Sequence, residues 1–240
     1  MAPHHLLRKV GLYLWVLAAG LLAALIYYPV ETMKLRAALV ALGIFVWCGL
    51  LVMLWGRRFL RGILVLITAI VAAFLSLPGR VSYDREALTG EYLAALQRYD
   101  GSPYVWGGEK LWGIDCSGLM RRALGDALIV QGVRTLNPTL IRQAARIWWD
   151  DTTASNLGEG RGGAKFLFDI PSINALDHAK IRPGDMAVTE SGVHILGYLG
   201  HDTWIEADPA EQKVLIARAP SETVLWFKGP MKVVRWEILE

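Results

Sequence analysis

A cysteine, a histidine and a carboxylate lie along the second half of the chain in an order that could build a nucleophile. The cysteine stands in the run Asp115-Cys116-Ser117-Gly118-Leu119, where a glycine-rich loop becomes a helical pattern. The unpaired N–H groups and the positive dipole end of a helix start stabilise a thiolate, so we expect a lowered pKa for Cys116. The alternative is a small buried cysteine that packs like an alanine.

The second group is His194, which opens two short apolar and aromatic runs separated by a polar turn. This pattern predicts a β-hairpin. If the turn is centred near Gly200, His194 and Glu206 lie opposite each other on one face of the sheet. Asp202 and Asp208 compete with Glu206 for that place, and an exposed strand carboxylate is the alternative role for Glu206. A cysteine, a histidine and a group that orients the histidine are the parts of a cysteine nucleophile system.

Four segments within residues 88–240 carry a resemblance to a known family, namely Tyr104 to Gly108, Asp115 to Leu119, Arg182 to Met186, and His194 to Ala207. They resemble the NlpC-like cell-wall cysteine peptidases, which have a pared-down papain-like fold. The resemblance implies that Cys116 is the nucleophile and His194 the general base. That family usually places His, Asn or Gln at the third position, where this chain has Glu206.

Three further residues near the nucleophile form the expected substrate-binding set. Tyr104 is expected to reach substrate, as the matching tyrosine of the family does, and loop packing is its alternative role. Asp115 and Ser117 flank the nucleophile, and Asp115 also stands where it could cap the helix. His178 and His201 fit no metal-ligand motif and are expected to be exposed, so we predict no metal and no cofactor.

Composition divides the chain into two parts. Of the 240 residues 54% are hydrophobic, and the excess lies in residues 1–79. Those residues carry a formal charge of +6 and the remainder −3, so the basic balance belongs to the apolar part and gives no sign of nucleic-acid binding. The two cysteines, Cys48 and Cys116, lie in different parts, and we predict no disulfide between them.

Three uncharged apolar runs predict transmembrane helices at about residues 10–28, 37–55 and 60–77. The first run is longer than a signal-peptide core and lacks a cleavage site, so we predict an uncleaved span. Glu31, Lys34 and Arg36 are expected to form a polar connection between the first two helices.

Basic residues predict the orientation in the membrane. The N-terminus and the second loop carry five Lys and Arg, whereas the opposite side carries three, counted with Arg80 after the third span. The positive-inside rule then predicts a cytoplasmic N-terminus. We expect a bacterial cytoplasmic (inner) membrane protein whose residues 80–240 form a periplasmic or extracellular domain.

That domain is predicted to be α+β, with helices packed on a small antiparallel sheet. The expected helices cover residues 87–99, 116–130 and 140–149, and the expected strands cover 186–189, the hairpin, 213–219 and 233–239. Residues 150–165 are polar and glycine-rich, and we expect either a surface connection or a lid beside the substrate.

The sequence therefore predicts a membrane-anchored cysteine peptidase or amidase that hydrolyses amide bonds in peptidoglycan stem peptides. The resemblance implies a bond next to a D-amino acid or a diamino acid, such as the γ-D-glutamyl to diamino acid bond. The expected partners are peptidoglycan and the lipid bilayer; nucleic acid is not expected, and protein partners are not readable. Two alternatives stay open, a papain-fold acyltransferase acting on lipid or other acyl substrates and a non-catalytic wall-binding module.

Overall fold

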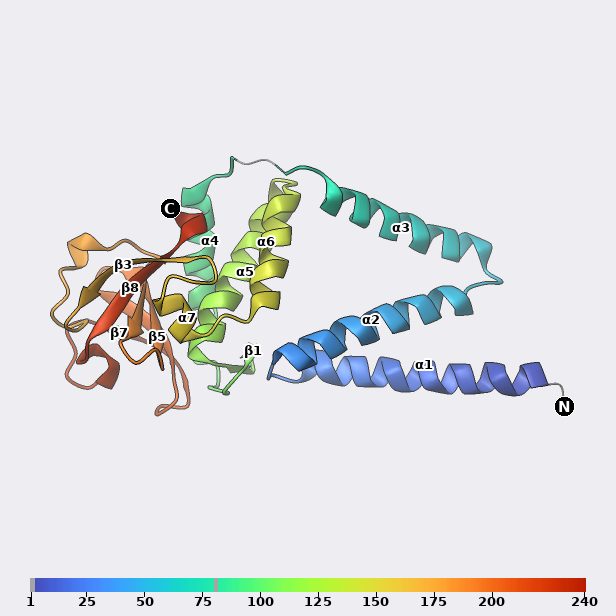
Figure 1. The fold of residues 1–240 in the computed structure, drawn as a ribbon, viewed down its shortest axis with the longest axis horizontal. Helices are drawn as coiled ribbons and strands as arrows, with labels where there is room; N and C mark the ends of the chain where they lie inside the picture. Colours follow the sequence, from blue (N-terminus) through green and yellow to red (C-terminus); the bar gives the residue numbers. More distant parts are fainter. Residues whose placement is uncertain (1–2, 80–81) are drawn as a thin grey trace. The chain divides into compact units, whose positions relative to one another are not determined.

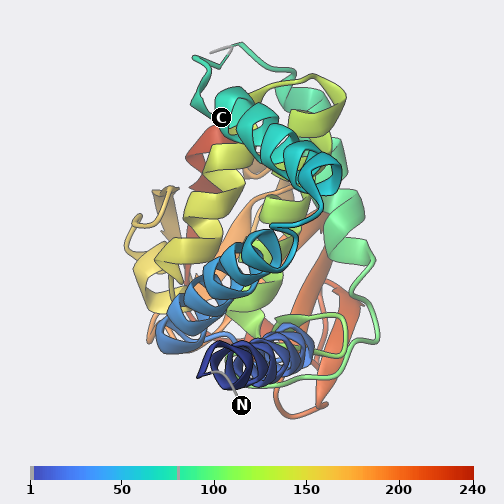
Figure 2. The ribbon, with the colours of Figure 1, turned by 90° about the vertical axis from the view of Figure 1, so that its right-hand side faces the viewer.

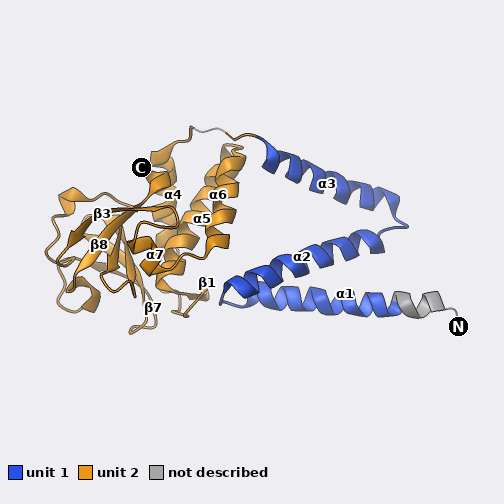
Figure 3. Cartoon of the chain, viewed as in Figure 1, with its two compact units in different colours: residues 1–77 blue, residues 78–240 orange. Residues whose placement is uncertain are grey.

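The structure is a computed structural model that describes residues 3–79 and 82–240, with the backbone alone for residues 3–8. Arg80 and the side chain of Arg8, both counted above for the orientation in the membrane, lie outside the described residues. The chain divides into two compact units, residues 1–77 and residues 78–240 (Figure 3).

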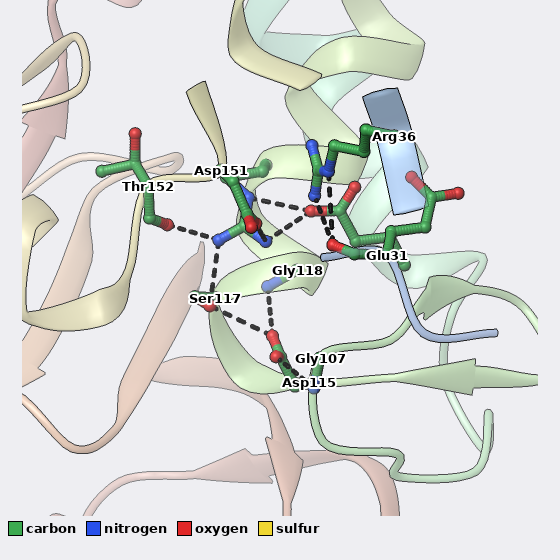
Figure 4. Close-up of polar contacts among 10 residues, drawn as sticks. Glu31, Arg36, Gly107, Asp115, Ser117, Gly118, Asp151 and Thr152 are labelled. Carbon is green, nitrogen blue, oxygen red and sulfur yellow. Dashed lines mark hydrogen bonds and ion pairs between the residues drawn. The ribbon is translucent and has the colours of Figure 1, made fainter. Parts of the chain in front are cut away.

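The first unit holds the apolar helices α1 (Pro3–Tyr27), α2 (Met33–Met53) and α3 (Arg58–Ser76) (Figure 1). Within the described residues these three helices are long and apolar enough to cross a membrane, which confirms the predicted helices. One boundary was wrong, because Lys34 and Arg36 lie in the first turns of α2 and not in the connection before it. The guanidinium of Arg36 donates to the carbonyl oxygen of Glu31 from Nε at 3.2 Å and from Nη2 at 3.1 Å, and this bond ties the connection to the helix start (Figure 4).

The helices of the second unit are α4 (Arg85–Gln97), α5 (Cys116–Arg134), α6 (Pro138–Asp150) and α7 (Ala154–Gly158). The first three confirm the predicted helices, although α5 runs four residues past its expected end at Val130. The short α7 corrects the expectation of a plain polar loop over residues 150–165. Its start is capped by Thr153, whose hydroxyl accepts from the backbone N–H of Asn156 at 3.3 Å.

The strands of the second unit are β1 (Glu109–Lys110), β2 (Gly113–Ile114), β3 (Ala164–Ile170), β4 (Met186–Thr189), β5 (Ile195–Gly200), β6 (Thr203–Asp208), β7 (Lys213–Arg218) and β8 (Met231–Trp236). The main sheet is antiparallel in the order β3-β8-β4-β5-β6-β7. Strand β3 was not predicted. Its buried and exposed residues do not alternate as they do in a regular half-buried strand, and its register with β8 shifts between Phe166 and Phe168. Strand β8 ends at Trp236, before a 3-10 turn that occupies the predicted continuation.

In the second unit the helices form one layer and the main sheet another (Figures 1 and 2). A hydrophobic core lies on each face of this sheet. Ile195 and Ile205 face the helices and join a core with Leu119 of α5. Their strand neighbours Leu196 and Trp204 face the opposite way and join a second core. This arrangement confirms the α+β class, and it sets the start of α5 against the β5–β6 hairpin.

The segment Arg182 to Met186 stabilises the start of β4 in the main sheet. Gly184 turns with φ of +96°, and the buried Asp185 that follows accepts two bonds from the guanidinium of Arg235, at 2.5 and 2.7 Å. The backbone N–H of Arg182 donates to the same carboxylate at 2.9 Å. This charged pair ties the start of β4 to β8.

Candidate active site

Cys116 is the first residue of α5, and the residue before it caps the helix. Asp115 has an extended backbone, and its Oδ1 accepts from the N–H of Gly118 at 2.5 Å and from the hydroxyl of Ser117 at 3.1 Å (Figure 4). An aspartate at this position satisfies the open N–H groups of a helix start. The structure therefore gives Asp115 and Ser117 an internal role in holding the helix that carries the thiol.

The glycine-rich loop before the nucleophile is tied to the same carboxylate. Gly107 has a φ of +73°, and its N–H donates to Asp115 Oδ2 at 2.8 Å (Figure 4). At Gly108 a Cβ atom would lie 2.3 Å from the carbonyl oxygen of Gly113, so only glycine fits. Glycines at these two positions let the loop close against the start of α5.

A buried ion-pair network lies one turn further along α5, and sequence reasoning missed it. Arg121 is 5% exposed and donates to Ser117 Oγ at 3.0 Å, to Glu109 Oε1 from Nε at 2.9 Å, and to Asp151 Oδ1 at 3.1 Å. The carbonyl oxygen of Thr152 also accepts from Arg121 (Figure 4). The only local signal was the four-residue spacing of Ser117 and Arg121, which places both on one helix face.

Cys116 is only 6% exposed, and its surroundings raise the pKa of the thiol, which the sequence predicted to be lowered. Burial raises the pKa of Cys116 to about 12, and the charge of Asp115 raises it further. The N–H groups of Ile195, Ser117 and Cys116 itself oppose this shift by donating to the sulfur. The predicted lowering of the pKa was wrong, because desolvation outweighs the helix start. The resting group is a thiol that needs a base.

His194 and Glu206 form a buried pair. Nε2 of His194 and Oε2 of Glu206 lie 2.6 Å apart, and both side chains are 1% exposed. Burial raises the pKa of Glu206, while the hydrogen bond with His194 lowers it. The other oxygen of Glu206, Oε1, is buried and has no hydrogen-bond partner in the described part of the chain. Because Nε2 is occupied, Nδ1 is the ring nitrogen left for another partner.

The hairpin reaches this contact in a register that differs from the expected one. The turn lies at His201 and Asp202, both with positive φ, and Tyr198 pairs with Trp204. The predicted centre near Gly200 was therefore wrong, and His194 and Glu206 are diagonal neighbours on one face instead of direct opposites. Diagonal positions are within reach of long side chains.

The competing carboxylates are engaged elsewhere. Asp208 accepts from the backbone N–H groups of Ala210 at 2.6 Å and Glu211 at 3.3 Å, which closes the turn after β6. Asp202 lies 3.5 Å from Nδ1 of His178. Of the three candidates, Glu206 is the one that contacts His194.

His178 is half-buried against the sheet, which corrects the expectation that it is exposed. Its Nε2 accepts from the indole N–H of Trp204 at 3.2 Å, and its ring lies 5.5 Å from that of Tyr198. His201 is exposed in the hairpin turn. Among residues 3–79 and 82–240, no cluster of three or more His, Cys, Asp or Glu side chains is placed to hold a metal ion.

Tyr104 lies close enough to the nucleophile for their charges to interact. Its ring is half-buried against the helix-side core, and its backbone N–H donates to the carbonyl of Gln212 at 2.9 Å. Burial raises the pKa of the Tyr104 hydroxyl to about 12, with further contributions from the charges of Cys116, Asp115 and Asp208. The residue therefore connects the glycine-rich loop with the turn before β7, beside the thiol.

Trp226 is a second residue that sequence reasoning missed. It lies in the 3-10 turn Leu225–Phe227, and its ring stacks on His194 with centroids 4.2 Å apart and planes inclined by 20°. Nothing in the sequence marked this tryptophan among the ten that the chain contains. Only the fold brings it over the histidine.

A model of the NlpC/P60 family matches residues 101–228. Among solved structures, the chain resembles the P60 domain of an antigen from M. avium subspecies paratuberculosis, with 21% identity over 65% of this chain and 98% of that one, at a TM-score of 0.39. A comparison with curated proteins gives no match.

Two further solved structures share the resemblance. The peptidoglycan hydrolase RipB from Mycobacterium tuberculosis is 17% identical over 85% of this chain and 89% of its own, at a TM-score of 0.42. NlpC1 from Trichomonas vaginalis is 17% identical over 65% of this chain, at a TM-score of 0.39, and the chain spans 46% of its length.

Proposed function

The chain belongs to the NlpC/P60 family, whose model matches more than half of its residues, and on that premise we propose that it hydrolyses amide bonds in peptidoglycan stem peptides. The family is typically one of cysteine hydrolases that act on peptidoglycan. One observation carries the proposal for this chain. His194, which is paired with the buried Glu206, directly precedes Ile195, and the N–H of Ile195 donates to the sulfur of Cys116.

The proposed reaction begins with proton transfer. His194 accepts the proton of the Cys116 thiol on Nδ1, because Nε2 is held by Glu206. Burial keeps the thiol protonated at rest, so the base acts as the substrate arrives. Glu206 stabilises the imidazolium that forms and fixes the plane of its ring.

The thiolate then attacks the carbonyl carbon of the amide and forms a tetrahedral oxyanion. Backbone N–H groups at the start of α5, including that of Cys116, are proposed to stabilise this charge. The imidazolium of His194 gives its proton to the leaving amine, the C–N bond breaks, and a thioester remains on Cys116. Water, deprotonated by His194, hydrolyses the thioester and restores the thiol.

Tyr104 is the proposed substrate contact, because it lies half-buried within electrostatic range of the thiol. Asp115 and Ser117 contribute by holding the helix start, since their polar atoms bond within the protein. The scissile bond is proposed to adjoin a D-amino acid or a diamino acid, as in the γ-D-glutamyl to diamino acid bond.

Residues 1–79 are proposed to anchor the hydrolase, residues 80–240, to the bacterial cytoplasmic membrane. The three apolar helices have the length and composition of membrane spans. Their basic flanks favour a cytoplasmic N-terminus and a periplasmic or extracellular catalytic domain. This orientation places the site on the side of the membrane where peptidoglycan lies.

The test is digestion of purified peptidoglycan and defined stem peptides by the full chain in detergent, with products identified by mass spectrometry. We expect specific peptide fragments from wild type and none from Cys116→Ala. Cys48→Ala is the matched control, because it removes the other cysteine and leaves the site intact. If folded wild type leaves every muropeptide intact, the hydrolase proposal fails, and acyl transfer to lipid or a wall-binding role takes its place.

A further inference from the structure

The ring of His194 is bonded through Nε2 to Glu206 of β6, and the indole of Trp226 covers one face of the ring. The ring of Trp226 lies 4.2 Å from that of His194 at an angle of 20°, which is close to parallel stacking. Glu206 leaves one buried oxygen without a partner in the described part of the chain, so its negative charge is poorly compensated. Among the described residues, His194 is the basic group that contacts this carboxylate.

Trp226 is held in place by a clamp that is remote in sequence. Asn174 donates through Nδ2 to the carbonyl of Ser221 and accepts through Oδ1 from the N–H of Ser221, both at 2.9 Å. The backbone N–H of Asn174 also donates to the carbonyl of Phe227 at 3.2 Å, and Phe227 is fully buried. These bonds fix the turn on both sides of Trp226, so the indole is presented to His194 by a rigid support.

We propose that Trp226 is a positioning residue for His194: its indole fixes the imidazole plane and favours the imidazolium, and thereby raises the fraction of Cys116 present as thiolate. The inference rests on the proposed roles of Cys116 and His194. The negative face of an aromatic ring attracts a cation stacked upon it, and the attraction grows when water is excluded. With His194 only 1% exposed, water is excluded here.

Glu206 also favours the imidazolium, through its bond to Nε2 at the ring edge, whereas Trp226 acts on the ring face. Glu206 and Asp208 project from β6, while Cys116, Asp115 and Tyr104 lie on the nucleophile side, and all of these are acidic groups. On the segment of Trp226 the charged residues are Glu222 and Lys228, which pair with each other at 3.2 Å at the surface. The indole is thus the group that stacks on the ring.

The test is the rate at which iodoacetamide alkylates Cys116 between pH 4 and pH 12, in the full chain carrying Cys48→Ala. Wild type is expected to show a plateau between an acid limb and an alkaline limb, where the thiol ionises directly. The plateau height measures the thiolate–imidazolium fraction. Trp226→Leu should lower the plateau about tenfold and Trp226→Phe about threefold. Both should move the acid limb to lower pH and leave the alkaline limb in place.

Leucine keeps the apolar bulk of the side chain and removes the π face, so it separates packing from stacking. Leu225→Ala is the matched control, because Leu225 lies in the same turn and is 72% exposed. If the tryptophan, phenylalanine and leucine plateaus are equal, Trp226 only fills space and the inference is overturned. If Trp226→Leu fails to fold, the threefold step from tryptophan to phenylalanine decides in the same way. If wild type has only an alkaline limb, the roles of Cys116 and His194 fail, and the inference fails with them.

Discussion

The two halves of the site are built in opposite ways. The helix start that carries Cys116 is satisfied by bonds from Asp115, Ser117 and Arg121. The hairpin that carries His194 and Glu206 has one strong bond and one buried carboxylate oxygen without a partner among the described residues. Loss of the bonds around the helix start is therefore expected to reduce mainly stability, and loss of the His194–Glu206 bond is expected to reduce mainly the chemistry.

The largest expected effect on this comparison is loss of the Arg121 network. Arg121→Met removes the buried ion pair that Arg121 makes with the carboxylate of Glu109, and should lower the free energy of unfolding by about 3–5 kcal/mol. Urea denaturation of the full chain in detergent, followed by tryptophan fluorescence, measures this loss.

The double variant Arg121→Met/Glu109→Leu is the control, because it removes both charges together. It should recover most of the stability, since a buried ion pair can often be replaced by apolar residues. A double variant as unstable as Arg121→Met would show that the network matters through its geometry and not through the buried charge of Glu109.

The second effect is a pH dependence that belongs to Cys116. The pKa of its thiol is raised from 9.0 to about 12 in the folded protein, so the folded state holds a proton that the unfolded state releases. The contribution of the neutral thiol to the free energy of unfolding is fully present below pH 9, and it falls by about 1.4 kcal/mol per pH unit as the pH rises toward 12. Urea denaturation of wild type and Cys116→Ala at pH 8, 9, 10 and 11 measures the difference, which should open above pH 9. A difference that is constant over this range would contradict the buried, neutral thiol.

The third effect separates chemistry from stability at Glu206. Glu206→Gln keeps the shape but replaces a charged acceptor of the imidazolium, so we expect turnover to fall about tenfold to hundredfold. Stem-peptide cleavage at pH 7 measures the loss. His194 should remain bonded to the glutamine, so the fold is expected to persist.

The stability of the same variant has a predicted sign. The pKa of Glu206 is raised by burial, so its contribution to stability is present at low pH and is lost as the pH rises through the folded pKa. The free energy of unfolding of Glu206→Gln, relative to that of wild type, should therefore increase as the pH rises from 4 to 8. The opposite trend would mean that the pair is held mainly by the ionised carboxylate.

The smallest effect is the loss of a helix cap. Asp115→Ala should cost about 1–2 kcal/mol, because it removes the cap of α5 and the tie to Gly107. The matched control is Asp84→Ala, which removes the cap of α4 at 2.9 Å from the N–H of Ala87 and lies away from the thiol. Thermal unfolding compares the two, and equal losses would show that the loop tie contributes nothing.

The difference between the helix start and the hairpin also explains which parts of the site could be predicted from the sequence. Asp115 lies directly before Cys116, so a local pattern was enough to place the nucleophile at a helix start and to name a cap. Apolar runs without charges predicted α1, α2 and α3 for the same reason, because each helix depends only on its own residues. The order of helix and strand patterns predicted the α+β class, and the family resemblance implied the papain-like fold.

The hairpin half depends on register and on distant packing, and there the sequence reached less far. The turn lies one residue later than expected, since positive φ at His201 and Asp202 was not readable from the pattern. Trp226 reaches His194 only through the Asn174 clamp, and burial reversed the expected shift of the Cys116 pKa. Each of these depends on contacts between segments that no local spacing encodes.

The measurement that tests the central claim most directly is the intact mass of the full chain, taken milliseconds to seconds after mixing with a stem peptide and quenching in acid. The account predicts a transient adduct of the acyl fragment that maps to Cys116 and is absent in Cys116→Ala. Cleavage of the peptide by Cys116→Ala at the wild-type rate, with no adduct on either protein, would contradict it.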